Sequence, residues 1–95
     1  MEIPVHWVDK LTWAELTASA ALASGETLSS FEPWKLFMDE ARIMVIEDEV
    51  TYKVSVLMPK RILGLKNWMD GRGTCPLEAC MKAVVKRQAA LASRS

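Results

Sequence analysis

The chain has 95 residues, of which 51% are apolar and 25% charged, with a formal net charge of zero. This length allows one domain with one core, because a chain of this size hides only about two-thirds of its unfolded surface on folding. The composition excludes a disordered tail, and the longest uncharged stretch, residues 16–25, is far shorter than the roughly 20 apolar residues that cross a bilayer.

Two elements are predicted before residue 25. Residues 3–8 are interpreted as an edge strand, since Pro4 cannot donate to a β-ladder. Thr12 and Glu15 match a capping box, which begins a helix that Gly25 would end in the left-handed conformation. The expected apolar face of this helix is made mostly of small side chains: Trp13, Leu16, Ala20 and Ala23.

The centre of the chain changes to the two-residue period of a strand. Residues 42–46 form a short β-like run, and an acidic triplet, Glu47-Asp48-Glu49, predicts a hairpin loop of three to five residues. Residues 34–38 fit either a third strand or a helical turn begun at Pro33. One buried strand face is predicted from alternation: Val50, Tyr52, Val54, Val56 and Met58.

The last third of the chain predicts two helices separated by a loop. Ile62, Leu65 and Met69 recur at helical spacing, and residues 70–74 have the composition of a loop. Pro76, with Glu78 in the first turn, begins a long helix expected to reach about Ala92. This helix is expected to bury Leu77, Met81 and Val84 against the sheet and to expose Lys82 and Lys86.

The order of these elements predicts the fold class α+β. We expect a small antiparallel sheet, a β-meander of two to four strands, flanked by an N-terminal helix and a long C-terminal helix. No repeat or linker divides the chain, so residues 1–95 are interpreted as a single small domain.

Charge is divided unevenly along the chain. Residues 1–49 contain ten acids and three bases, a net of −7, whereas residues 50–95 contain nine bases and two acids, a net of +7. Such asymmetry indicates charged partners, unless acidic turns and basic helices neutralise each other within the domain. Both interpretations stay open at this level.

The charged segments give two candidate binding sites. Lys82, Lys86 and Arg87 are candidate contacts for a phosphate backbone, although the zero net charge and the missing RNP, zinc-finger and helix-turn-helix patterns favour a solvated helix face. The acidic triplet is a candidate contact for a basic protein surface, although hairpin turns are usually polar in any case.

Four tryptophans exceed what so small a core readily hides. Trp7 and Trp68, which have polar neighbours, are candidate interface residues, whereas Trp13 and Trp34 are expected in the core.

Cofactor and catalytic chemistry find little support in the sequence. The segment from Gly71 to Thr74 precedes a helix, as an anion-binding loop would, but it lacks the spacing of a phosphate loop. His6, Cys75 and Cys80 are three possible zinc ligands without the usual spacing or a fourth member. No nucleophile is paired with a base. We therefore expect no metal, no cofactor and no enzyme.

The N-terminal residues have neither a basic start nor an apolar segment, so we expect a cytoplasmic protein without a membrane partner. Cys75 and Cys80 would point about 140° apart on one helix, which does not suit a disulfide, so both are expected as thiols.

The sequence therefore favours a non-enzymatic module that binds another protein, and we expect it to form a homodimer. Its size and its lack of motifs, rather than any likeness of residues, suggest the accessory or inhibitor type that phages encode. The alternative is a nucleic-acid-binding module that uses the basic C-terminal helix, and an anion-binding or small-molecule-binding domain comes third.

Overall fold

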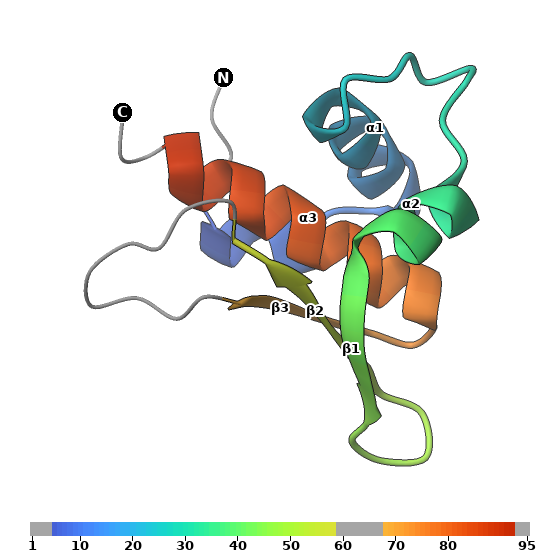
Figure 1. Cartoon of the computed structure of the whole chain (residues 1–95), viewed down its shortest axis with the longest axis vertical. Coiled ribbons are helices and arrows are strands. Elements are labelled where there is room, and N and C mark those ends of the chain that lie inside the picture. The colour runs from blue at the N-terminus through green and yellow to red at the C-terminus, as the bar shows by residue number, and fades with distance from the viewer. Residues whose placement is uncertain (1–4, 59–67, 93–95) are drawn as a thin grey trace.

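The computed structural model describes residues 5–58 and 68–92 (Figure 1). These residues form an antiparallel sheet and helices, with a long helix at the C-terminal end, which confirms the α+β class. The elements in chain order are the 3-10 helix η1 (Val5–Lys10), α1 (Trp13–Ala23), α2 (Pro33–Glu40), β1 (Ala41–Ile46), β2 (Tyr52–Leu57), β3 (Trp68–Gly73) and α3 (Pro76–Ala92).

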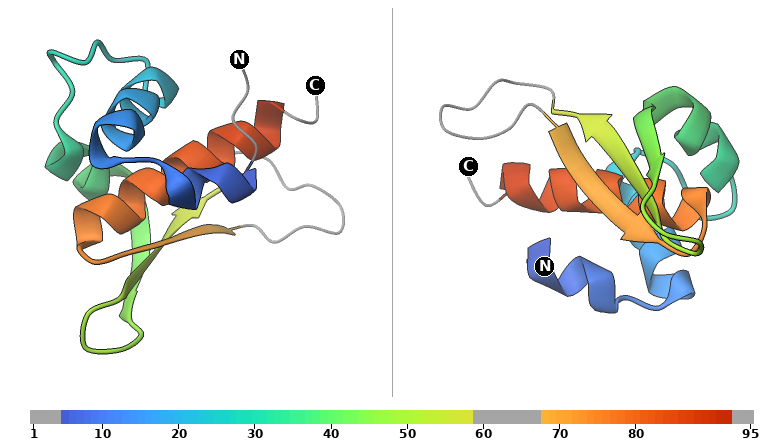
Figure 2. Two further views of the ribbon diagram at one scale, coloured as in Figure 1. Left: turned by 180° about the vertical axis from the view of Figure 1, so that it is seen from behind. Right: turned by 90° about the horizontal axis from the view of Figure 1, so that it is seen from below.

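Helix α3 is the centre of the domain. The strands β2 and β3 pack along it, and η1, α1 and α2 also contact it (Figures 1 and 2). The predicted burial of Met81 and Val84 is confirmed, and Leu77 is partly buried. Other faces of α3 are buried too, at Ala79, Cys80, Ala83 and Val85. A helix enclosed on several sides needs small residues wherever another backbone comes close.

The sheet has the order β1-β2-β3, with antiparallel pairing throughout. Strand β2 is central. Val54 and Val56 are buried as predicted, as is Met58 just after the strand, and Tyr52 is partly buried; Ser55, expected on the other face, is buried as well. Val50 lies in the hairpin loop and is exposed, so the predicted buried face does not extend that far. The acidic triplet forms the first part of this loop, as predicted.

Strand β3 corrects two predictions. Met69 was expected on a helix and residues 70–74 in a loop, but Trp68–Gly73 is a strand; Ile62 and Leu65 lie outside the described residues. Gly71 and Gly73 do not form a turn; they allow β3 to pack closely against α3. A Cβ on Gly71 would lie 2.2 Å from the Ala79 carbonyl oxygen, and one on Gly73 would lie 2.5 Å from Glu78 Oε1. Glycine in a strand commonly marks such an approach of another backbone.

The predicted N-terminal edge strand is also wrong, because Val5–Lys10 is a 3-10 helix and residues 1–4 lie outside the described part. Val8 is fully buried, so one side chain of η1 anchors it in the core. The capping box of α1 is confirmed: the Thr12 N–H donates to Glu15 Oε1 at 2.9 Å, and the Glu15 N–H donates to Thr12 Oγ1 at 3.2 Å. Gly25 has φ 72°, as predicted for the residue that ends this helix.

The ambiguous segment after Pro33 is helical, with proline in the first turn of α2. Leu36 is its buried residue. Trp13 and Trp34 are exposed and not in the core as expected, because Leu16, Ala20 and Ala21 are the buried residues of α1 and Leu36 faces inward from α2.

Candidate functional site

The three basic residues of α3 are held in ion pairs. Lys82 Nζ lies 3.4 Å from Glu78 Oε1, and Lys86 Nζ lies 3.2 Å from Asp9 Oδ2. Both lysine side chains are only 13% exposed, so the prediction that they are exposed is wrong. Glu78, the partner of Lys82, is itself 24% exposed, whereas Asp9, the partner of Lys86, stays 53% exposed at the surface.

Arg87 connects three elements of the fold. Its guanidinium forms an ion pair with Glu40 at the end of α2 and donates to the carbonyl oxygen of Leu57 at 3.0 Å. The side chains of the pair are 20% and 28% exposed. This position gives Arg87 a structural explanation that does not involve a ligand.

The acidic triplet is partly engaged, by β3 and by its own hairpin. Glu47 Oε1 lies 2.6 Å from Arg72 Nε on β3. Asp48 Oδ1 accepts from the backbone N–H of Val50 at 3.0 Å and of Thr51 at 2.9 Å, and the bond from Val50 is the main reason that the pKa of Asp48 is lowered. Glu49 is exposed.

Part of the opposed charge of the two halves of the chain is therefore neutralised by ion pairs within the domain. Among residues 5–58 and 68–92, the cross-element ion pairs Lys86–Asp9, Arg87–Glu40 and Arg72–Glu47 each join a base of the second half to an acid of the first. This arrangement favours internal neutralisation over charged partners as the explanation of the two opposed halves.

The predicted anion loop is not formed as a loop. Gly71 and Gly73 belong to β3, where they pack against α3. The next residue, Thr74, uses its N–H to donate to Glu78 Oε1 at 3.2 Å. In the structure, this segment lets β3 pack closely against α3.

Cys75 and Cys80 are free thiols, as expected. The pKa of Cys80 is raised to about 12, mainly by desolvation on burial and to a smaller extent by the charge of Glu40, while Arg87 acts in the opposite direction. In the part of the chain that the structure describes, no three potential metal ligands gather. The side chain of His6 lies outside that description.

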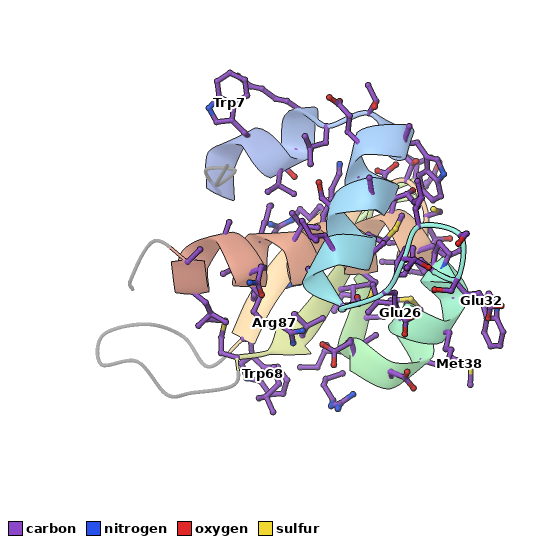
Figure 3. The ribbon with its side chains drawn as sticks, turned by 90° about the horizontal axis from the view of Figure 1, so that it is seen from above. Trp7, Glu26, Glu32, Met38, Trp68 and Arg87 are labelled. Atoms are coloured by element: carbon purple, nitrogen blue, oxygen red, sulfur yellow. The ribbon has the colours of Figure 1, made fainter. Side chains whose placement is uncertain are left out.

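A hollow of about 450 Å³ lies beside the end of α1, the following loop, α2 and Arg87. Figure 3 labels three of its lining residues, Glu26, Glu32 and Arg87. Its charged lining residues are Glu26, Glu32, Lys35, Asp39, Glu40 and Arg87. Ser24 and Ser30 add hydroxyl groups, but the lining contains neither histidine nor cysteine to act with them. The hollow is therefore an acidic surface feature without a paired nucleophile among its lining residues.

Trp7 and Trp68, the two candidate interface tryptophans, are both exposed, but they lie on opposite sides of the molecule (Figure 3). Trp7 is on η1, where Lys10 Nζ lies 5.3 Å from its ring centroid. Trp68 begins β3 and pairs with Leu57 of β2. The two tryptophans therefore cannot belong to one compact contact surface.

One face of the sheet lies away from α3 (Figure 2, right). Gly71 pairs with Val54 on the α3 side, so the neighbouring pairs, Ser55 with Asp70 and Leu57 with Trp68, point to the other side. The 2.6 Å hydrogen bond from Ser55 Oγ to Asp70 Oδ1 agrees with this assignment. We call this side the open face; its exposed apolar residues are Ile43, Val45, Leu57 and Trp68.

Strand β1 is an edge strand with four consecutive exposed apolar residues. We call this segment, Ile43 to Ile46, the apolar edge; the exposed fractions of its residues are 45%, 47%, 41% and 59%. The Glu47 N–H donates to the Thr51 carbonyl, so by antiparallel alternation the backbone groups of Met44 and Ile46 point away from β2. The sequence predicted a strand here, but nothing in its pattern distinguished an edge from the centre of a sheet.

None of the helices within the described ranges combines the length and the apolar character needed to cross a bilayer. The chain matches no protein-family model, no curated protein sequence and no solved structure.

Proposed function

We propose that the protein is a non-enzymatic interaction module that binds an extended polypeptide segment along β1. The observation that carries this proposal is the apolar edge, in which exposed apolar side chains accompany backbone groups that point away from the sheet. A bound segment would add a strand to the sheet: main-chain hydrogen bonds would supply affinity, and the alternating side chains would supply specificity.

Edge strands are normally protected against such pairing by charges, proline, bulges or a covering element. Strand β1 has a register shift between Ala41 and Ile43, but from Ile43 to Ile46 it carries no charge and no proline. Its side chains there remain exposed on both faces. A contiguous exposed apolar stretch on a small domain is typical of an interaction site, whereas single exposed apolar residues are not.

The open face extends the same surface beyond β1. Leu57 and Trp68 are adjacent across β2 and β3, and the ion pair between Arg72 and Glu47 lies nearer the hairpin. Between them lie Ser55 and Asp70, so the open face alternates apolar and polar pairs. The proposal keeps a cytoplasmic module of accessory or inhibitor type, and it assigns Trp68 but not Trp7 to the binding side.

The basic residues of α3 give the nucleic-acid alternative less support than the sequence suggested. Lys82, Lys86 and Arg87 have carboxylate partners within the domain, and their side chains are largely covered. Contact with phosphates would have to replace these ion pairs, so the electrostatic gain that usually drives such binding would be reduced.

Affinity capture from the native host, with nuclease treatment, tests the proposal. Val45→Glu places a charge in the apolar edge opposite Lys53, a position where the folded domain tolerates it. Leu22→Glu is the matched control, because Leu22 is 82% exposed on α1. We expect the parent protein and the Leu22 variant to retain the same polypeptide and the Val45 variant to lose it. Equal retention by both variants would contradict binding along β1.

A further inference from the structure

We propose that the segment bound by β1 is β1 of a second copy of this chain, so that two sheets join into one continuous antiparallel sheet. This inference rests on the proposed function and names its partner. It requires a two-fold axis perpendicular to the sheet, which is the symmetry of most protein dimers. Both copies would then carry α3 on the same side of the combined sheet, and the two open faces would adjoin on the other side.

The backbone of β1 is suited to this pairing. Met44 and Ile46 direct their N–H and C=O groups away from β2, and Figure 1 shows the hairpin of β1 and β2 reaching beyond the helices. An antiparallel contact centred on Met44 pairs Met44 with its symmetry mate and sets Ile43 opposite Val45 of the other copy. Every residue from Ile43 to Val45 then meets an apolar residue on the same face.

Charge complementarity favours a second copy over an arbitrary strand. Arg42 stands at one end of the apolar edge and the acidic triplet at the other. The Arg42 guanidinium donates to the Asp39 carbonyl oxygen at 2.9 Å but forms no ion pair with any described residue. Antiparallel pairing brings Arg42 of each copy toward the acidic triplet of the other, at both ends of the contact.

The opposite orientation lacks this match. Parallel pairing of two β1 strands would place one acidic triplet beside the other and Arg42 beside Arg42, which is repulsive at both ends. The charges thus select the antiparallel orientation that the two-fold symmetry also requires.

Sedimentation velocity over a wide micromolar range tests self-association. We expect the parent protein to pass from monomer to dimer as concentration rises. Met44→Lys places two like charges together at the two-fold axis, so it should remain monomeric. At concentrations low enough for the parent to be monomeric, both should melt at the same temperature, since Met44 is 47% exposed. Leu22→Lys, exposed on α1, should dimerise as the parent does. A parent that is monomeric at every concentration overturns the inference.

Oxidative cross-linking tests the register. In a Cys75→Ser background, Met44→Cys should form a disulfide-linked dimer with diamide, because hydrogen-bonded antiparallel pairs have Cα atoms about 5.5 Å apart. Ile46→Cys is the matched control on the same face: its two copies would be about 14 Å apart, four residues along the strand, and should not cross-link. Equal cross-linking at both positions indicates random collision and contradicts the proposed pairing.

The two proposals fail separately. If the parent is monomeric and Val45→Glu nevertheless abolishes capture of a host polypeptide, binding along β1 stands and the second copy is wrong. If the parent dimerises but Met44→Lys dimerises equally well, the dimer uses another surface and the inference is overturned. Dimerisation that Met44→Lys abolishes and that Met44→Cys traps supports it.

Discussion

Gly71 of β3 lies directly against Ala83 of α3, where a Cβ on the glycine would lie 2.4 Å from the Ala83 nitrogen. Gly71→Ala should therefore destabilise the domain by about 3 kcal/mol, the upper part of the usual range for overpacking, because the opposing atoms are backbone. Gly73→Ala meets the Glu78 side chain, which can move, so its loss should be smaller. Urea denaturation measures both, and a Gly71 variant as stable as the parent would refute the packing of β3 on α3.

The ion pair between Arg87 and Glu40 should contribute measurably to stability. Arg87→Ala removes the partner of a half-covered carboxylate and a donor to Leu57, so we expect a loss of about 1–2 kcal/mol after allowance for partial exposure. Lys35→Ala is the control, since Lys35 is exposed on α2 away from β1 and should change stability by less than about 0.5 kcal/mol. Thermal melts of the two variants compare them, and equal melting temperatures would show that the Arg87 pair contributes nothing.

Nucleic-acid binding should be weak or absent. Because Lys82, Lys86 and Arg87 are engaged within the domain, the parent should show no sub-micromolar shift of single-stranded or double-stranded DNA or RNA at physiological salt. Replacing all three with Gln should lower the melting temperature instead. Tight binding that disappears in the triple variant would favour the nucleic-acid alternative.

Cys80 should be chemically silent in the folded protein. Burial raises its pKa from 9.0 to about 12, so the native state keeps the thiol protonated where the unfolded state ionises. The resulting stabilisation is complete below about pH 9 and is lost as the pH rises toward about 12. At mildly alkaline pH, iodoacetamide should label the partly exposed Cys75 and reach Cys80 only after unfolding. Mass spectrometry measures the labelling of each cysteine. Equal labelling of Cys75 and Cys80 in the folded protein would contradict the burial of Cys80.

Local signals in the sequence predicted the helices that carry them. The capping box at Thr12 and the proline at position 76 act within one helical turn, so neighbouring residues were enough to place both helices. The alternation in β2 predicted a strand because its inner residues are buried against one layer.

Several errors arose where a contact between two elements decides the structure. Gly71 and Gly73 have the composition of a loop until Ala79, Ala83 and Glu78 are placed beside them. Lys86 appeared solvated because its partner, Asp9, is distant in sequence. The edge position of β1 could not be predicted either, since an apolar run has the same pattern at the edge of a sheet and at its centre.

Amide hydrogen exchange resolved by NMR tests the central claim most directly. The N–H of Val45 points toward β2, whereas those of Met44 and Ile46 point outward, so Val45 is an internal control on the same strand. Pairing along β1 predicts that exchange at Met44 and Ile46 slows as protein concentration rises and stays fast in the Met44→Lys variant, with Val45 protected throughout. Fast exchange at Met44 and Ile46 at every concentration at which the protein is a dimer would contradict the account.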